Sequence, residues 1–577
     1  MSEPERETPA SLVRYRGTAT RVLDALLESE PVWATQLGDH RFDHALPDLS
    51  AEAIDQRAGL LNEALAALDG LDDAGLDSDD LVDLESLRTK VSADLWTLTE
   101  LRPQEWDPIV HLPGDAIYTL VARDTGEPVE RARALAARLR AVPRHLQTAR
   151  ERLGDMPRVH VETARLQLAG CLSLLGEGVD ELLERAPTER VLLDEPRETA
   201  RQALLEYGAW LGDRAESAGR DPRLGERAFA ARLWYALDTE IDPDALLTRA
   251  ESDLMALEEE IASVAARIGP GLGVVTSGAP SRAVRDVLDA LAASGPVTNE
   301  TVLPLCRRWL KVTQEVVREH NLVTMYDDPV RIIEMPESRR GVSVAYCEPP
   351  GALEGRSPRV ADGEFNAVPT LFAVSPAPAD WGSEQVGSYY REYNRHMLLN
   401  LTVHEAMPGH VLQLQHSRRY RGNTDVRAAL GSGTFIEGWA VHAEQLVADA
   451  VARSAPEGVD VEALRMQQLK MRLRSTINAI LDVRVHSRGM SREEAMRLMT
   501  VRGHQEEREA AGKWRRALLT SAQLSTYYVG HQEVSAIARD LAAEQPGLSV
   551  REVHDTVLAH GSPSPRLLRL LLELVSG

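Results

Sequence analysis

Helical spacing of apolar residues runs through most of this 577-residue chain. From about residue 11 to 322, apolar side chains recur every three or four positions in segments such as RARALAARLRAV and RAESDLMALEEEIASVAARI. Each such segment can bury one stripe of a helix. Aromatic residues make up only 5% of the chain, so its core must consist mainly of Leu, Val and Ala. Leu and Ala favour helix, and we expect a mainly α fold.

Residues 323–381 interrupt this pattern with dense Pro and Gly. The β-prone runs VRIIEM, VSVAYCE and AVPTLFAV are separated there by turn-forming residues. We expect two or three strands in a small antiparallel β-sheet insertion. Helical spacing then returns, and we expect helices near 388–407, 410–420, 433–452, 461–487, 491–502, 505–515, 522–543, 549–560 and 564–575. The chain is thus expected to form one continuous unit, with a helical N-terminal region (1–322) and a catalytic region (323–577).

The chain is acidic, with 65 Lys and Arg against 89 Asp and Glu and a net charge of −24. Nucleic acid and anionic membranes both favour basic faces, so neither is an expected partner. The sequence contains no apolar run of about 18 residues and no apolar segment of a secretory signal near its start. Its three scattered Cys fit a reducing compartment. We expect a cytoplasmic protein, and the oligomeric state stays open.

The densest group of candidate metal ligands is LTVHEAMPGHVLQLQH, residues 401–416. In zinc enzymes with the pattern H-E-x-x-H, two His four residues apart reach one metal, and the Glu beside the first activates water. Here the position four residues after His404 is Pro408, and the next His is His410. On a regular helix His410 would lie about 240° around the axis from His404 and point away.

The dipeptide Pro408-Gly409 offers a way around this conflict. Proline lacks the N–H that a helix interior needs, and glycine permits unusual backbone conformations. A break there could return His410 to the face of His404, with Glu405 beside the metal as general base. The alternative is an ordinary helix–turn–helix in which His404 makes a polar contact.

A third candidate ligand is Glu437, in the segment GTFIEGWAVHAEQL. Zinc peptidases of the gluzincin type take a Glu from a following helix, and the apolar neighbours of Glu437 mean that its carboxylate needs a partner. The alternative partner is an arginine, Arg472 or Arg474. Glu444 returns to the same helix face, so it is a candidate for orienting a ligand His from behind, as is Gln413.

Several long motifs together resemble the family catalogued as domain of unknown function 885. They are YREYNRHMLLNLTVHEAMPGHVLQ, GTFIEGWAVHAE, AILDVRVHSRGMSREEA and STYYVGHQEV. That family is distantly similar to carboxypeptidase Taq-type zinc metallopeptidases. The resemblance implies a large helical zincin-like metallopeptidase body with a central groove, which we place between the N-terminal helices and the C-terminal region. It also implies one divalent metal ion, expected to be zinc. Many members carry two adjacent His where this chain has His410-Val411.

Further residues are candidates for substrate contacts. A zinc hydrolase must stabilise an oxyanion, and Tyr527 or Tyr528 could supply the hydroxyl, with Tyr528 favoured for its nearness to Gly530. Arg484 or His486 could bind a substrate carboxylate. Their alternative is to complement a helix C-terminus. Tyr346 could line the groove. Ordinary packing in the core or on a strand is the alternative for the tyrosines.

These features predict a zinc-dependent hydrolase that cleaves a peptide or amide bond with a metal-activated water and Glu405 as base. The alternatives are a hydrolase of non-peptide amides or esters, and a non-catalytic helical binding protein with a vestigial metal site. The presence of Glu405 beside His404 favours an enzyme, because a vestigial site has no need of it.

Overall fold

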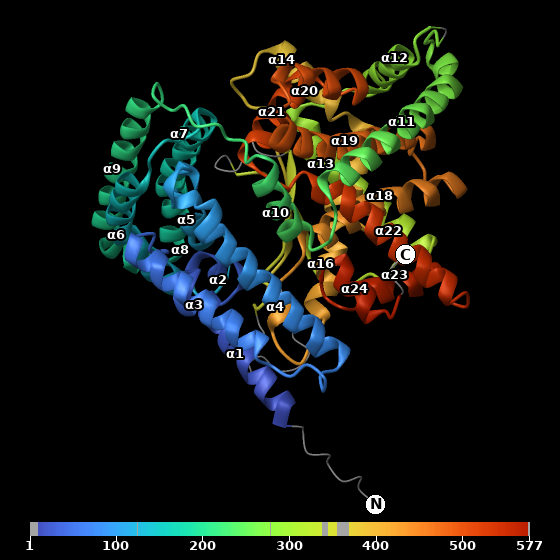
Figure 1. Ribbon diagram of the computed structural model, residues 1–577. Coiled ribbons are helices and arrows are strands. Elements are labelled where there is room, and N and C mark those ends of the chain that lie inside the picture. The colour runs from blue at the N-terminus through green and yellow to red at the C-terminus, as the bar shows by residue number, and fades with distance from the viewer. Residues whose placement is uncertain (1–9, 124, 277, 337–343, 355–367, 575–577) are drawn as a thin grey trace, which may run out of the picture.

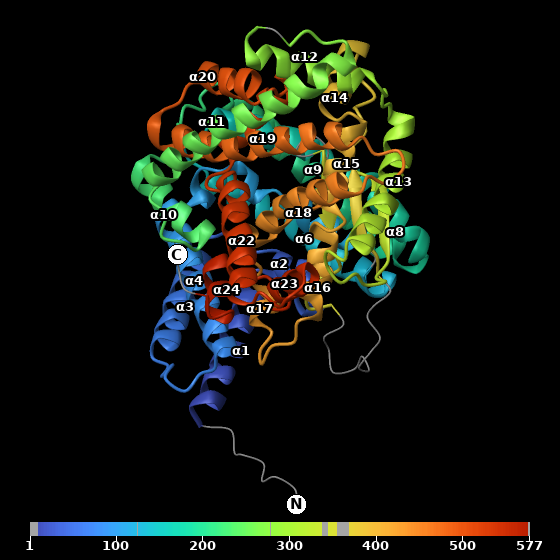
Figure 2. The same ribbon diagram turned by 90° about the vertical axis from the view of Figure 1, so that its right-hand side faces the viewer.

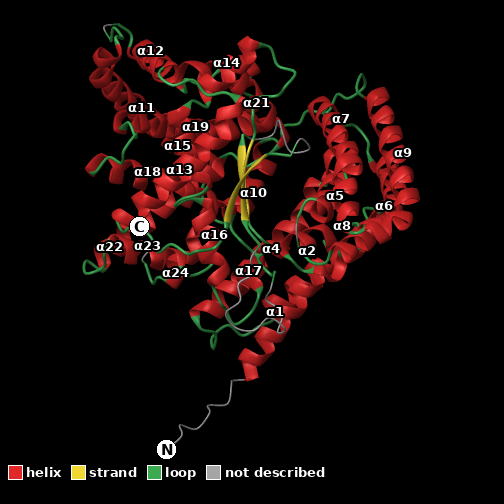
Figure 3. Cartoon of the chain, turned by 180° about the vertical axis from the view of Figure 1, so that it is seen from behind, coloured by secondary structure: helices red, strands yellow, loops and turns green. Residues whose placement is uncertain are grey.

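The computed structural model describes residues 10–123, 125–276, 278–336, 344–354 and 368–574. Helices dominate these residues, as the apolar spacing predicted, and they surround a small sheet (Figures 1 and 3). Among the described residues, no helix combines the length and the apolar character that crossing a membrane requires.

The first nine α-helices form two packed groups, which occupy the lower centre and the left of Figure 1. The first group is built by α1 (Ala10–Ser29), α2 (Pro31–Leu37), α3 (Ala51–Asp69) and α4 (Ser78–Trp96). The second is built by α5 (Gly114–Val121), α6 (Pro128–Arg152), α7 (Arg158–Ser173), α8 (Val179–Arg185) and α9 (Arg190–Arg214). Each group buries its own cluster of mainly Leu, Val and Ala side chains.

The next four helices pack with the C-terminal part of the chain. They are α10 (Glu226–Leu237), α11 (Pro243–Ile268), α12 (Pro280–Ala293) and α13 (Asn299–Glu319). Side chains of α10 to α12 share one core with α19 (Val461–Arg488), and α13 shares another with the sheet. Helices α1 to α9 therefore bury their side chains mainly against one another, although the first group also buries Val426 and Ala429 from the C-terminal part of the chain. The division of the chain at residue 322 stays a prediction.

The C-terminal helices follow the predicted spans with one clear difference. The span 388–407 is two helices, α14 (Ser383–Glu392) and α15 (Arg395–Glu405). Asn394 separates them because its side chain caps α15, accepting from the backbone N–H groups of His396 and Met397. The remaining helices are α16 (His410–Arg419), α17 (Val426–Ala429), α18 (Gly433–Arg453), α20 (Arg492–Arg497), α21 (Glu507–Leu519), α22 (Ser525–Glu544), α23 (Val550–Leu558) and α24 (Pro565–Leu571).

The sheet is mixed, so the prediction of an antiparallel sheet was wrong. Its strands β1 (Val330–Glu334), β2 (Ala345–Glu348) and β3 (Thr370–Val374) lie in the order β1-β3-β2. The central strand β3 pairs parallel with β1 and antiparallel with β2. Parallel neighbours need a long connection, and β2 lies between β1 and β3 in the sequence. Turn-forming residues in the sequence do not reveal that β1 pairs with β3 and not with β2.

A close approach of α18 and α22 sets the position of the candidate site (Figure 2). A methyl group on Gly438 would lie 2.3 Å from the carbonyl carbon of Gly530, and one on Gly530 would lie 2.1 Å from the carbonyl oxygen of Thr434. Only glycines allow this spacing. It brings the first turns of α22 next to Glu437 on α18.

Candidate metal centre

A short break separates α15, which ends at Glu405, from α16, which begins at His410. The Gly409 N–H donates to the carbonyl of Val403 over 2.9 Å, and Trp439 Nε1 donates to the carbonyl of Pro408 over 2.8 Å. A methyl group on Gly409 would lie 1.9 Å from the carbonyl oxygen of His404. The predicted interruption at Pro408-Gly409 is confirmed, and it folds α16 back against the end of α15.

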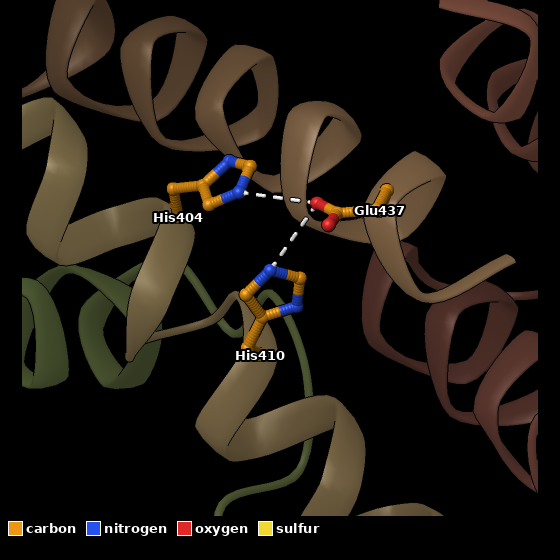
Figure 4. Close-up of side chains that lie close together, drawn as sticks. All are labelled: His404, His410 and Glu437. Atoms are coloured by element: carbon orange, nitrogen blue, oxygen red, sulfur yellow. Dashed lines mark ion pairs between the residues drawn. The ribbon is translucent and has the colours of Figure 1, made fainter. Parts of the chain in front are cut away.

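This break brings the two imidazoles together, with ring centroids 4.7 Å apart. Glu437 on α18 faces both rings (Figure 4). Its Oε2 lies 3.5 Å from His404 Nε2 and 3.4 Å from His410 Nε2. Among the described residues, the ion-pair partners of Glu437 are these two His and neither Arg472 nor Arg474, so the arginine alternative does not apply. Arg474 instead pairs with Glu509 and Glu392.

The spacing of these three atoms fits ligands around one metal ion. Zinc bonds of roughly 2.0–2.1 Å in a tetrahedron place neighbouring ligand atoms about 3.3 Å apart, close to both observed distances. One ligand atom from each of the three residues lies within 4.8 Å of the other two. Glu437 Oε2 is also buried without a hydrogen bond from any described residue. A buried carboxylate oxygen in that state is costly, and a cation would satisfy it.

Glu444 forms a hydrogen bond with His404 through the ring nitrogen that does not face Glu437. His404 Nδ1 donates to Glu444 Oε1 over 2.8 Å, and Asn400 Nδ2 donates to Glu444 Oε2 over 2.7 Å. With Nδ1 carrying the proton, Nε2 of His404 is free to face Glu437 and a metal. The structure thus places Glu444 where the sequence predicted a residue that orients a ligand.

The charged groups of this cluster shift the pKa values of His404 and Glu437. Burial opposes protonation of His404, but Glu437 and Glu444 outweigh it and hold the pKa of His404 well above its usual range. Burial would likewise raise the pKa of Glu437, but His404 and His410 outweigh it and hold that pKa well below its usual range. The two carboxylates therefore draw a proton onto His404, where a metal ion would supply the charge instead.

Glu405 directly follows His404 in the chain, and both residues line a cavity of about 360 Å³. Burial raises the pKa of Glu405, an effect that His410 and His404 partly offset. The described residues that line this cavity all fall between Val344 and Tyr527. These lining residues belong to the C-terminal region, and the groove expected between the N-terminal helices and that region stays a prediction.

Tyr527 lines this cavity and Tyr528 does not. The Tyr527 hydroxyl accepts from Arg516 Nη2 over 3.0 Å and from Gln523 Nε2 over 3.3 Å. Its own proton is free to point to a ligand, because no described residue accepts it. Burial and the charge of Glu437 raise the pKa of Tyr527, although Arg516 opposes this, so the phenol stays protonated.

Tyr528 points into the core that contains α11, where its hydroxyl donates to Asp253 over 2.7 Å. The preference for Tyr528 was therefore wrong. Neighbouring residues on a helix differ by about 100° in direction, and the contact of α18 with α22 decides which of them faces the metal centre.

The other sequence candidates lie away from the cavity. Gln413 donates to Ser562, and neither Gln413 nor Tyr346 is among the residues that line the cavity. Tyr346 lies on β2, with its hydroxyl 3.5 Å from that of Tyr118. Arg484 pairs with Glu251, and His486 is buried against Phe229 with its Nε2 facing the carbonyls of Ala517 and Thr520. Arg484 and His486 therefore have structural roles, and their assignment to substrate binding was wrong.

Sequence reasoning missed the charged residues of α21 that line the same cavity. Arg508, Glu509, Lys513 and Arg516 share one face of this helix. Glu509, Lys513 and Arg516 follow one another at spacings of four and three residues, which was visible in the sequence. A charged stripe of that kind usually faces solvent, and only the packing of α21 shows that this one faces a cavity.

The fold and the cluster together define a mainly helical protein with a His-His-Glu constellation beside a cavity. The chain belongs to a family described as "Bacterial protein of unknown function (DUF885)", whose model matches residues 31–572. No curated protein matches the chain.

Two solved structures share the fold over nearly the whole chain. One is a candidate lipoprotein of unknown function from Shewanella oneidensis, with a TM-score of 0.79 and 24% identity, covering 97% of this chain and 99% of that one. The other is a candidate lipoprotein from Colwellia psychrerythraea, with a TM-score of 0.78 and 15% identity, covering 98% of this chain and 99% of that one. At these identities the likeness shows the fold alone.

Proposed function

We propose that this protein is a metal-dependent hydrolase that cleaves a peptide or other amide bond, with His404, His410 and Glu437 as ligands of one divalent metal ion, most suitably Zn²⁺. The observation that carries the proposal is the spacing of 3.4 and 3.5 Å between Glu437 Oε2 and the two imidazole nitrogens, beside a cavity that Glu405 lines. Two His and one carboxylate are a ligand set typical of catalytic zinc. When bound, the metal would polarise the scissile carbonyl and make a water molecule more acidic.

The chain's own residues would carry out the proton transfers. Glu405 faces the cavity next to His404 and has no hydrogen-bond partner among the described residues, so its carboxylate is available to take a proton from the attacking water. Its raised pKa then favours passing that proton to the leaving nitrogen. The uncommitted hydroxyl proton of Tyr527 would stabilise negative charge on the carbonyl oxygen.

The test is a comparison of wild type with Glu405→Gln on a panel of short peptides and simple amides, together with metal analysis. The Gln side chain keeps the shape of Glu405 but cannot accept the proton. We expect close to one equivalent of metal in both proteins, and a turnover about 10²–10⁴-fold lower in the variant. The exposed Glu457, in the loop between α18 and α19, gives the matched control: Glu457→Gln should retain full activity.

Two results would contradict the proposal. Cleavage that survives both chelation and Glu405→Gln would come from another site or a contaminant. A metal-loaded wild type that cleaves no peptide, amide or ester would favour a non-catalytic binding protein. Cleavage of esters or non-peptide amides alone would keep the metal chemistry and change the substrate class.

A further inference from the structure

Helix α21 forms one wall of the cavity. The basic side chains on this side of the cavity are not all neutralised by the carboxylates around them. Glu509 pairs with Arg474 and accepts from the Tyr393 hydroxyl over 2.9 Å. Glu392 pairs with Lys470 over 3.0 Å, and Glu506 pairs with Arg391 over 2.9 Å. Each of these three carboxylates therefore already has a cationic partner.

Lys513 is the exception among the buried cations of this wall. Its side chain is only 6% exposed and lines the cavity. No carboxylate oxygen of the described residues lies within 4.0 Å of its amine, and no described residue hydrogen-bonds it. Burial, together with the nearby Arg474 and Arg516, lowers the pKa of Lys513 well below its usual range, although Glu509 and Glu392 oppose this.

Arg516 lies one turn further along the same face of α21. Among the described residues, its Nη2 donates to two neutral oxygens, those of Tyr527 and Gln523, over 3.0 and 2.8 Å. Because Tyr527 is itself next to Glu437, Arg516 connects this cationic wall to the candidate metal centre. The cavity thus contains an amine and a guanidinium, neither of which forms an ion pair with a described carboxylate, close to the proposed reacting atoms.

We propose that Lys513 and Arg516 form a carboxylate-binding subsite, so that the substrate of this cavity is an amide that carries a free carboxylate near the scissile bond. An ammonium and a guanidinium are the usual partners of a carboxylate in proteins. Met397, Leu401 and Met471 line the same cavity and suit an apolar side chain next to that carboxylate. The link to turnover rests on the proposed hydrolase function, whereas carboxylate binding does not.

Calorimetric titration of the full-length protein with 3-phenylpropanoate and with its neutral counterpart 3-phenylpropanamide tests the subsite. We expect the carboxylate to bind about tenfold or more tightly than the amide, the scale of one charge-assisted hydrogen bond. Lys513→Met keeps the aliphatic stem and removes the charge, so it should abolish this preference. Lys513→Arg, which keeps the charge, should retain part of it. Lys311→Met removes an exposed lysine on α13 and should leave the preference unchanged.

Equal binding of the two probes by wild type would overturn the subsite. A preference that persists in Lys513→Met would also overturn it, because the carboxylate would then bind elsewhere, for example to a metal. The wild-type comparison does not depend on the folding of any variant.

Turnover separates this inference from the proposed function. A dipeptide and an N-acetyl amino acid, each with a free or an amidated carboxyl group, distinguish a peptide terminus from an acylated amino acid as the source of the carboxylate. Carboxylate binding without cleavage of any substrate would refute the hydrolase and keep the subsite. Equal cleavage of the free and amidated forms would keep the hydrolase and refute the subsite.

Discussion

Two buried charged clusters of this molecule differ in whether their polar atoms are satisfied. One joins α4 to α17 and consists of Asp79, Asp83, Thr424 and Arg427, here called the Arg427 cluster. The other, here called the His404 cluster, consists of His404, His410, Glu437 and Glu444. Both are assembled from segments far apart in the sequence, and both remove charge from water.

In the Arg427 cluster all three guanidinium nitrogens donate hydrogen bonds. Arg427 donates from Nε to Asp83 over 2.9 Å, from Nη1 to the Asp79 carboxylate over 2.8 Å and from Nη2 to the Asp79 carbonyl over 2.7 Å. Thr424 donates to the second oxygen of Asp83. In the His404 cluster, by contrast, Glu437 Oε2 and His410 Nδ1 are buried without a hydrogen-bond partner among the described residues. A complete network holds segments together, whereas an incomplete one beside a cavity indicates a ligand.

The largest expected effect concerns metal occupancy. His404→Ala and Glu437→Ala each remove one of three proposed ligands, so both should reduce bound divalent metal from about one equivalent per chain to near zero. Elemental analysis of purified protein measures this directly. Arg427→Met is the control and should leave occupancy unchanged. Full occupancy in either ligand variant would contradict the ligand assignment.

Arg427→Met should instead affect stability. It leaves the buried Asp83 carboxylate without its cation, and breaking a buried ion pair from one side costs about 3–5 kcal/mol in the free energy of unfolding. Denaturant unfolding followed by circular dichroism measures the loss. A change below about 1 kcal/mol, the usual contribution of an exposed ion pair, would mean that the two clusters do not differ as described.

The adjacent tyrosines of α22 show the same contrast. The hydroxyl proton of Tyr527 has no acceptor among the described residues, whereas that of Tyr528 is donated to Asp253. Tyr527→Phe should lower kcat by up to about 10²–10³-fold, as does loss of an oxyanion donor in other enzymes, with little change in stability. Tyr528→Phe should leave kcat nearly unchanged and lower stability by about 1.5–3 kcal/mol, since it loses a hydrogen bond to the charged Asp253. The reverse pattern would restore Tyr528 as the catalytic candidate.

The smallest effect is expected for Glu444, which contacts a proposed metal ligand and not the metal itself. Glu444→Gln still accepts a hydrogen bond from His404 but removes the negative charge that polarises it, so metal affinity should fall by about 10–100-fold. Competition with a chelator of known affinity measures this change. An unaltered affinity would show that Glu444 only holds α15 against α18.

Much of the candidate site followed from local sequence. The pair Pro408-Gly409 predicted the break that turns His410 back to His404, because both residues act on the backbone where they stand. Glu444 was placed behind His404 by helical spacing from Glu437. The same kind of reasoning failed at Arg484 and His486, whose partners Glu251 and Ala517 lie on other helices.

The sequence by itself determined the helical class, the positions of most C-terminal helices and the three residues that meet at the candidate metal centre. These depend on periodicity, caps and backbone breaks, which act over a few residues. Only the tertiary structure decided that the sheet is mixed, that the cavity lies within the C-terminal region, and that Tyr527 and Lys513 face it. The physical reason is that a helix offers every direction around its axis, and the neighbours packed against it decide which of them is buried, paired or open to a ligand.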